Sequence, residues 1–332
     1  MKFGEVPVQE AKGGLVAHAI VLPDRRLKKG HVLSQDDLQQ LVDAGVEQLT
    51  IAQLEVGDVE ENAAATQLSA QLTSNGIVAA DAFTGRVNLY AKATGIFHAD
   101  SGIVDRFNRI SPAITLASLN DGVFVEAGRM VATVKIIPFA VEQEFVAQAE
   151  QIISGNDVLS VAQSRSLQVG LVATQLPSLK PATMDKTARI LADRLKPSRS
   201  TVIAERRVDH HAGAVASALG ELQDQCDMLI VFGASAITDR QDVIPSGIEQ
   251  AGGTVDHFGM PVDPGNLLLL GKLNGKVVIG APGCARSPAE NGFDWVLQRA
   301  ICDLPIDEAY ITGLGVGGLL MEINARPQPR EG

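Results

Sequence analysis

The chain has 332 residues, of which 45% are hydrophobic and 20% charged, a composition typical of globular rather than disordered proteins. Its 28 Lys and Arg against 39 Asp and Glu give a net charge of −11, which argues against nucleic-acid or anionic-membrane binding as a main function. The start MKFGEVPVQE lacks the apolar core of a signal peptide, and no apolar run approaches the ~20 residues of a membrane span. Cys226, Cys284 and Cys302 form neither a CxxC pair nor an even disulfide set, so we expect a reducing, cytoplasmic setting.

Residues 1–80 are predicted to form a small α/β accessory region. The sequence Ser34-Gln35-Asp36-Asp37 is typical of the start of an amphipathic helix, and Gly45 supplies its stop. A strand is expected over Val46–Ile51 and a second helix over Glu60–Leu72.

Residues 81–160 are predicted to form a β-rich accessory region that ends in one helix. Several short apolar runs separated by glycine-containing turns indicate a compact β domain. Asp100-Ser101-Gly102 is one of these expected turns. The predicted strands are Arg86–Ala91, Ile114–Leu119, Val123–Val125 and Met130–Ile137, and the predicted helix is Val141–Ile153.

Residues 161–326 alternate between strands and helices, and residues 327–332 read as a tail or linker. This alternation predicts an α/β fold: a mostly parallel sheet with helices on both faces, which is a three-layer αβα domain. The predicted strands are Leu167–Ala173, Thr201–Ala204, Met228–Phe232, Leu267–Leu270 and Val277–Ile279, and the predicted helices are Pro181–Leu195, Ala212–Leu222, Gln241–Ala251 and Pro288–Cys302.

Three apolar runs between residues 227 and 290 each lead towards a loop of small residues. The loops are Gly233-Ala234-Ser235, Asp263-Pro264-Gly265-Asn266 and Pro282-Gly283-Cys284-Ala285-Arg286-Ser287. Short apolar runs bounded by Gly and Pro are typical of buried strands. In open α/β sheets, ligands bind where strands end at their carboxyl edge, so the stretch predicts a small-molecule site.

The first loop carries two carboxylates, Asp239 and Asp242, at an expected helix start. Thr238 and Gln241 match a capping box, whose free N–H groups suit an anion. The two acids either bind a divalent metal or merely complement the helix dipole, and spacing alone favours the second interpretation.

The third loop gives the stronger local signal. Ser287-Pro288-Ala289-Glu290 matches a capping box with proline at the first helical position, and Arg286 directly precedes it. An arginine beside free backbone N–H groups is a good receptor for phosphate or carboxylate, although it could instead pair with a surface acid. Cys284 has no histidine nearby in sequence to activate it, which favours a small buried side chain over a nucleophile.

Two further patterns are weaker. The turn Pro261–Asn266 is equally consistent with a pocket wall and with an ordinary connection. His210-His211 at an expected helix start favours a solvated cap over a metal site.

In this order and spacing the three loops resemble the molybdopterin-binding domain of MoeA-like, gephyrin-like and MogA-like proteins of molybdenum cofactor biosynthesis. The resemblance covers roughly residues 167–303 and rests on Gly233-Ala234-Ser235 with Asp242, on Pro264-Gly265-Asn266, and on Pro282–Ser287. The chain departs from the family pattern at Ala173-Thr174-Gln175-Leu176, where the family has acids, and at Asp263, where it has a basic residue.

The resemblance implies binding of molybdopterin, or of its nucleotide form, by a cytoplasmic homodimer that uses molybdate and Mg²⁺ in a transferase reaction. Asp242 and Asp239 would be the catalytic and metal-binding residues. A client molybdoenzyme would be a protein partner, and no nucleic acid or membrane partner is expected. The cofactor-binding residues it implies are Thr174, Gly233, Ala234, Ser235, Pro264, Gly265, Asn266, Pro282, Gly283, Cys284, Arg286 and Ser287.

Three functions stay open from the sequence. The first is an enzyme of molybdenum insertion or cofactor maturation, similar to molybdopterin molybdotransferases. The second is a non-catalytic carrier or maturation factor, which the missing acids at 173–176 and Asp263 favour. The third is a nucleotide-pyrophosphate hydrolase on the same type of domain.

Overall fold

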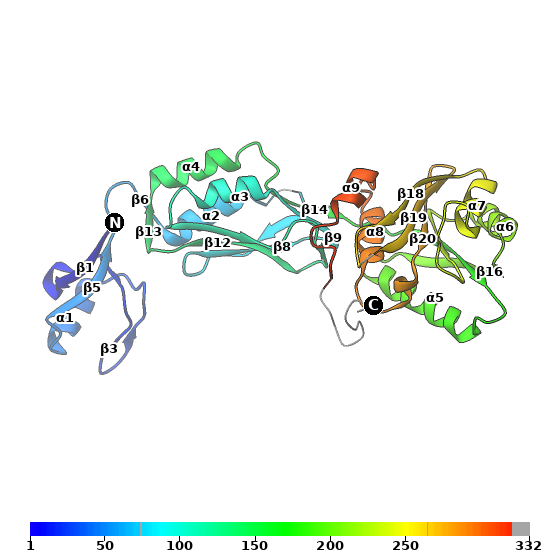
Figure 1. The fold of residues 1–332 in the computed structure, drawn as a ribbon. Coiled ribbons are helices and arrows are strands. Elements are labelled where there is room, and N and C mark those ends of the chain that lie inside the picture. Colours follow the sequence, from blue (N-terminus) through cyan, green and yellow to red (C-terminus); the bar gives the residue numbers. More distant parts are fainter. Residues whose placement is uncertain (74, 264, 321–332) are drawn as a thin grey trace, which may run out of the picture. The chain divides into compact units, whose positions relative to one another are not determined.

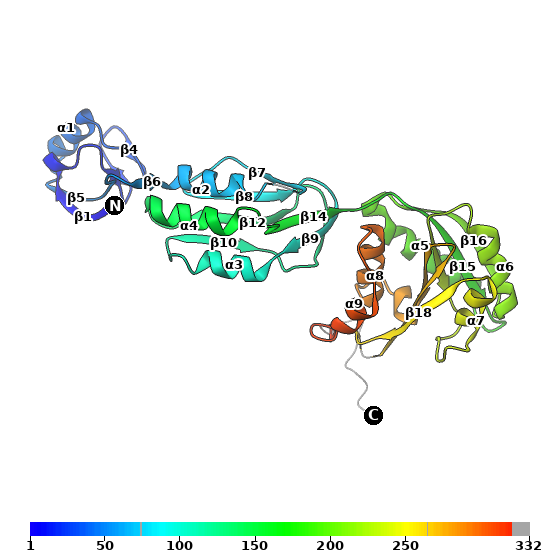
Figure 2. The same cartoon turned by 90° about the horizontal axis from the view of Figure 1, so that it is seen from above.

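A computed structural model describes residues 1–73, 75–263 and 265–320 (Figures 1 and 2). Contacts divide the chain into two compact units, one of Met1–Ala93 with Phe97–Ala162, and one of Thr94–Ile96 with the chain from Gln163 onward. The expected tail at 327–332 and the expected domain end at 326 lie outside the described residues. Within the described ranges, no helix combines the length and apolarity that a membrane crossing needs.

The amino-terminal part of the first unit contains a small antiparallel sheet, ordered β1-β5-β2. Leu38 and Leu41 of helix α1 pack into the hydrophobic core that this sheet shares. Ser34 caps α1 by accepting the backbone N–H of Asp37, and the Asp37 carboxylate accepts the backbone N–H of Ser34. Gly45, with φ of +77°, follows the helix end. The elements are β1 (Lys2–Pro7), β2 (Leu15–Val16), β3 (Ile20–Val21), β4 (Arg26–Leu27), α1 (Gln35–Asp43) and β5 (Gln48–Gln53), with a 3₁₀ turn η1 (Val8–Glu10).

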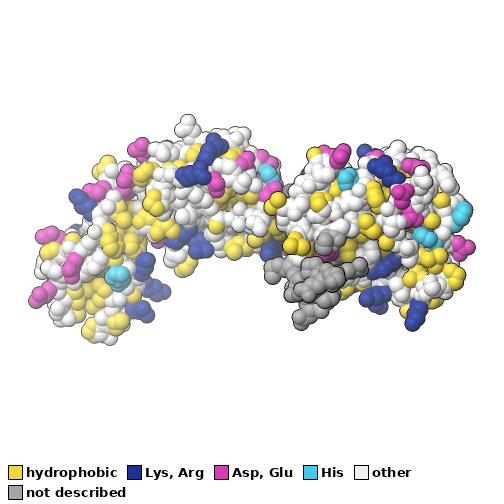
Figure 3. Space-filling view, viewed as in Figure 1, with side chains coloured by type: hydrophobic (Ala, Val, Ile, Leu, Met, Phe, Trp, Pro, Cys, Tyr) yellow, Lys and Arg dark blue, Asp and Glu magenta, His cyan; other side chains and the backbone are white. Residues whose placement is uncertain are grey.

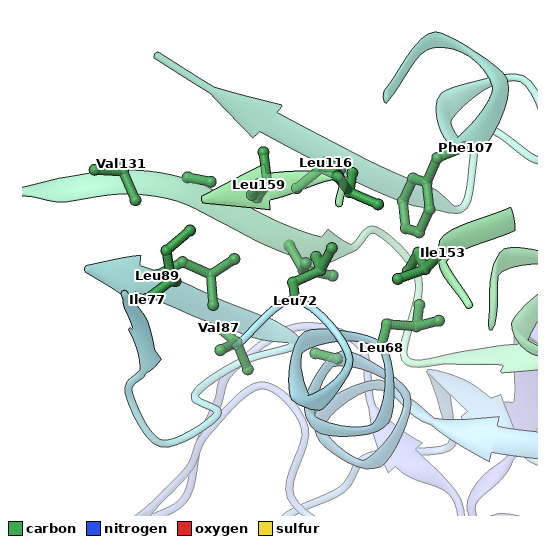
Figure 4. Close-up of a cluster of buried hydrophobic side chains, with 14 of the residues drawn as sticks. Leu68, Leu72, Ile77, Val87, Leu89, Phe107, Leu116, Val131, Ile153 and Leu159 are labelled. Carbon is green, nitrogen blue, oxygen red and sulfur yellow. The ribbon is translucent and has the colours of Figure 1, made fainter. Parts of the chain in front are cut away.

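The remainder of the first unit is an antiparallel sheet, ordered β10-β12-β8-β7, with α2, α3 and α4 on one face (Figure 1). Figure 4 shows Leu68 and Leu72, on or just after α2, packed beside Val87 and Leu89 of β8. The elements are β6 (Asp58–Glu60), α2 (Glu61–Ala70), β7 (Ile77–Ala79), β8 (Arg86–Ala91), β9 (Gly95–Ala99), α3 (Ser101–Asn108), β10 (Ile114–Ser118), β11 (Phe124–Val125), β12 (Met130–Ile136), β13 (Ala140–Glu142), α4 (Gln143–Ile153) and β14 (Leu159–Gln163).

This region differs from the expectation in two places. Asp100-Ser101-Gly102 is the start of helix α3 and not a turn, because the Asp100 carboxylate accepts the backbone N–H of Ile103 and caps the helix. The expected boundary at residue 80 falls inside one core, since β7 pairs with β8 and α2 packs on β8 and β12.

The second unit contains a mixed sheet of six strands in the order β16-β15-β17-β20-β19-β18. The first four run parallel, whereas β19 is antiparallel to both of its neighbours. The elements are β15 (Gln168–Gln175), α5 (Pro181–Leu195), β16 (Thr201–Asp209), α6 (Ala212–Leu222), β17 (Met228–Phe232), α7 (Val243–Gln250), β18 (Thr254–Met260), β19 (Asn266–Leu273), β20 (Lys276–Ala281), α8 (Gly292–Ile301) and α9 (Glu308–Gly313), with 3₁₀ turns η2 (Lys196–Ser198) and η3 (Gly283–Arg286).

The sheet is mixed but mostly parallel, because β19 alone runs against the other five strands. Asn274 and Gly275 both have positive φ, 49° and 76°, between β19 and β20. This is the backbone of a tight two-residue hairpin, which forces the two strands to be antiparallel. Strand β18 was not expected, because the polar residues Asp256 and His257 interrupt its apolar pattern.

Two hydrophobic clusters show the layers of the second unit. Met228, Ile230 and Phe232 of β17 face the cluster that contains α5, α8 and α9. Leu229 and Val231 of the same strand face the cluster that contains α6 and α7. Both faces of the strand are buried because side chains alternate along it, and the two sets of helices lie on opposite faces of the sheet (Figure 2).

Candidate functional site

The parallel strands β15, β16, β17 and β20 end at the same edge of the sheet. Thr174 near the end of β15 is 1% exposed, and its hydroxyl accepts the backbone N–H of Ala234 at 2.7 Å. The same hydroxyl lies 2.9 Å from Nδ1 of His210, just after β16. One threonine thus joins three strand-end loops.

Arg286 brings the loop after β20 to the same place. Its guanidinium donates to the carbonyl of Gly233 at 2.6 Å and to the hydroxyl of Thr187 at 3.0 Å, and it lies 5.3 Å from the ring centre of Phe232. Burial lowers the pKa of Arg286 from its usual value. Among the described residues no carboxylate forms an ion pair with Arg286, and only two of its five N–H groups have a protein acceptor.

Gly233 must be a glycine at this point of the chain. A Cβ built on it would lie 2.7 Å from the carbonyl oxygen of Ser235, closer than real Cβ contacts. Ser235, two residues further on, is exposed in the same loop. The chain therefore turns sharply at Gly233. The Gly233 carbonyl accepts a hydrogen bond from Arg286, and the N–H of Ala234 donates one to the Thr174 hydroxyl.

A buried ion pair holds the loop after β20, and the sequence did not reveal it. Arg194 of α5 forms a salt bridge with Asp294 of α8, with Nε 2.6 Å from the carboxylate oxygen. It also donates to the carbonyls of Ala285 and Ser287, both at 2.7 Å. The partners are about a hundred residues apart in sequence, so no local pattern could have indicated the contact.

The expected helix start at Ser287-Pro288 is corrected. The helix begins at Gly292, because Asn291 caps it and forms a capping box with Asp294. Ser287 instead accepts the N–H of Ala289 with its hydroxyl. Arg286 therefore ends the 3₁₀ turn η3 and does not directly precede the helix.

Cys284 and Asn266 also meet at this edge. The Asn266 amide is 4% exposed and lies 3.5 Å from the Cys284 sulfur, which in turn lies 3.7 Å from Oδ1 of Asn291. Gly265, with φ of +80°, directly precedes β19, while Pro264 lies outside the described residues. Pro282 and Gly283 lead into η3 beside Cys284.

The carboxylates of Asp239 and Asp242 accept hydrogen bonds from the backbone N–H groups of nearby residues. Asp242 caps α7, accepting the N–H of Val243 at 2.7 Å and of Thr238 at 3.0 Å. Asp239 accepts the N–H of Gln241 at 2.7 Å. The expected capping box of Thr238 with Gln241 is therefore wrong, since the helix starts at Val243 with Asp242 as its cap. His211 likewise caps α6 by accepting from Gly213.

In residues 1–73, 75–263 and 265–320, no group of three His, Cys, Asp or Glu side chains could hold a metal ion. Asp239 and Asp242 cap backbone N–H groups here and do not form a metal cage made of protein ligands alone.

The chain was matched to one protein family and to several solved structures. A protein-family profile described as a domain of unknown function, DUF8806, matches residues 5–53. No curated protein matches the chain. Among solved structures, a molybdopterin biosynthesis MoeA protein from Pyrococcus horikoshii is 15% identical, with a TM-score of 0.31 over 90% of this chain and 75% of that chain. A molybdenum cofactor biosynthesis protein from Pyrococcus furiosus is 11% identical, with a TM-score of 0.27 over 94% of this chain and 65% of that chain. At these TM-scores neither match establishes a shared fold or function.

Proposed function

We propose that the second unit binds molybdopterin or its nucleotide form in molybdenum cofactor biosynthesis, with the ligand's phosphate at Arg286. The observation that carries the proposal is the half-buried Arg286 guanidinium, which has no carboxylate partner among the described residues. A desolvated cation at the carboxyl edge of a sheet is stabilised by an anion. The resemblance of the three loops supplies the identity of that anion.

The roles of the other residues follow from their contacts. Gly233 and Ala234 hold their turn against Arg286 and Thr174, and Cys284 with Asn266 lines the neighbouring strand end. Ser235, exposed in the same turn, is a further donor for the ligand. Ser287 contributes to the loop shape through its bond to Ala289.

The second candidate role, a non-catalytic carrier, is favoured by one specific observation. The carboxylates of Asp239 and Asp242 accept hydrogen bonds from backbone N–H groups, and we therefore assign these two residues no metal-dependent reaction step. Molybdate insertion with Mg²⁺ and dimer formation stay predictions from the resemblance. A hydrolase of nucleotide pyrophosphates needs activated water and gains no support from this arrangement.

Fluorescence-detected binding of molybdopterin tests the proposal, with and without Mg²⁺. We expect saturable binding by the wild type and about tenfold weaker binding by Arg286→Ala, the loss typical of one charge-assisted contact. Arg189→Ala is the matched control, because Arg189 is exposed on α5 and forms no ion pair in the described part of the chain. Equal affinity of the two variants would remove Arg286 from the site, and absence of binding by the wild type would reject the proposal.

A further inference from the structure

The first unit contains a cavity that the proposed function does not use. Its volume is about 630 Å³, within the range of small-molecule sites. It is lined by the amino-terminal part of the unit and by strands β8 and β12. The residues that matter for its chemistry are Phe3, Lys29, Glu61, Arg86, Lys135 and Phe139.

The lining carries an excess of positive charge. The Lys135 ammonium lies 3.6 Å from the Glu61 carboxylate, and these two charges offset each other. Burial raises the pKa of Glu61, against the opposing effect of the nearby Lys135. Lys29 and Arg86 form no ion pair within 4.0 Å anywhere in the described ranges. Three cationic side chains, Lys29, Arg86 and Lys135, therefore line the cavity beside one carboxylate, Glu61, in a protein whose net charge is −11. On the face drawn in Figure 3, by contrast, acidic and basic side chains are interspersed.

The sheet places two of the cations directly opposite each other. Arg86 on β8 and Lys135 on β12 are cross-strand partners in the antiparallel ladder. Like charges in this position destabilise a sheet, and Glu61 beside Lys135 offsets one of the two charges. Gly85 leaves room for this arrangement, because a Cβ there would lie 2.5 Å from Glu61 Oε2 and 2.9 Å from Lys135 Nζ.

The remaining wall is apolar and open. Phe3 is 58% exposed and Ile137 is 57% exposed, although both are large hydrophobic residues lining the cavity. The Lys29 ammonium lies 5.1 Å from the ring centre of Phe139, so an aromatic ring and a cation already meet there. A ligand with an apolar or planar body would cover this wall and remove it from water.

Lys135 already donates to the carbonyls of Thr84 and Ile136 and pairs with Glu61, so it adds charge to the cavity but not a free donor. We propose that this cavity binds a small organic anion, whose phosphate or carboxylate contacts Lys29 and Arg86 and whose planar body covers Phe3 and Ile137. The site is separate in residues and in unit from the loops around Arg286, so either site can be real without the other.

Pyridoxal 5′-phosphate is a suitable probe, because it joins a planar ring, a phosphate and an aldehyde. The neutral amine of a nearby lysine adds to the aldehyde and water leaves; borohydride then reduces the resulting imine to a stable secondary amine. Peptide mapping after limited labelling identifies the modified lysine. We expect label on Lys29 about tenfold above Lys28, which is exposed and does not line the cavity.

Matched variants test the role of the charge. Arg86→Gln should reduce this labelling about tenfold, whereas Arg26→Gln, at an exposed arginine outside the cavity, should leave it unchanged. Pyridoxal, which lacks the phosphate, should label Lys28 and Lys29 equally. Equal labelling of Lys28 and Lys29 by the phosphate probe, or no effect of Arg86→Gln in a protein with wild-type circular dichroism, would overturn the proposal.

Discussion

The hydroxyl of Thr174 and the backbone N–H of Ala234 are joined by a 2.7 Å hydrogen bond that ties the end of β15 to the loop after β17. Thr174 is almost fully buried, so this bond is shielded from water. The turn that presents the Gly233 carbonyl to Arg286 therefore depends on a side chain from a different strand.

Replacing Thr174 by Val tests this link. Valine keeps the shape but removes the hydroxyl, which leaves the Ala234 N–H without its acceptor. We expect the free energy of unfolding to fall by about 1–2 kcal/mol, measured by urea denaturation. Thr174→Ser retains the hydroxyl and is the control. A Val variant as stable as the Ser variant would show that the bond contributes little.

The ion pair of Arg194 with Asp294 should be the most sensitive point of the loop after β20. Asp294→Ala leaves a buried guanidinium without its carboxylate, and we expect a loss of about 3–5 kcal/mol in the free energy of unfolding. The double variant Arg194→Met with Asp294→Leu removes both charges and should recover much of that loss. If the double variant is less stable than Asp294→Ala, the carbonyl bonds of Arg194 outweigh the ion pair.

Asp242→Ala separates a structural role from a metal-binding one. Since Asp242 caps α7, the variant should lose about 1 kcal/mol of stability. Molybdopterin affinity, measured by fluorescence with and without Mg²⁺, should remain that of the wild type. A selective loss of the Mg²⁺ effect would instead favour the metal-binding interpretation that the sequence left open.

Asp37 gives the first unit a defined acid sensitivity. Burial raises the pKa of Asp37, but hydrogen bonds from the side chain and backbone of Ser34 and from His31 outweigh it, so the net pKa lies below its usual 3.8. A carboxyl with a lowered folded-state pKa stabilises the fold above the unfolded pKa, near pH 4, and loses this contribution as the pH falls towards the folded value. The free energy of unfolding should therefore decline below about pH 4.

The control for this pH dependence is Asp37→Asn, which cannot ionise. We expect its stability to be lower near pH 7 and to change less between about pH 5 and pH 2. Parallel pH profiles for the two proteins would assign the acid sensitivity to other carboxylates.

Cysteine reactivity offers an independent readout of the strand-end loops. Burial raises the pKa of Cys302 to about 11 and also raises the pKa of Cys226, so both are poor thiolates near pH 8. Cys284 is only half-buried. Iodoacetamide should modify Cys284 first, by mass spectrometry, and molybdopterin should slow that reaction if the proposed site is correct. Urea-unfolded protein, in which all three thiols are exposed, is the control.

The sequence predicts regular elements well where burial and local capping agree. Arg86–Ala91, Pro181–Leu195, Ala212–Leu222 and Met228–Phe232 have the expected bounds. Each combines a strong apolar period with clear end signals. At Asp100 the same turn-forming residues serve as a helix cap, and sequence alone does not distinguish these two uses.

The candidate site was predictable only in its location. Gly and Pro after buried strands indicated where the loops gather, and Thr174, Gly233 and Arg286 do meet there. The contacts that shape the loops could not be predicted, because Arg194 and Asp294 belong to helices far apart in sequence. Asp242 was expected within the first turn of a helix capped by Thr238. In the structure Asp242 is itself the residue that caps helix α7.

The two outer strands of the six-stranded sheet have a consequence for self-association. Strand β18 pairs with β19 through two register shifts, around Val255/His257 and Phe258/Met260, so its outer edge is irregular. Strand β16, at the other edge, carries Glu205, Arg206 and Arg207 in sequence. Bulged and charged edges offer a poor template to a strand from another molecule. Both edges therefore disfavour the addition of a strand from a second copy, which makes fibre-like stacking of the second unit unfavourable.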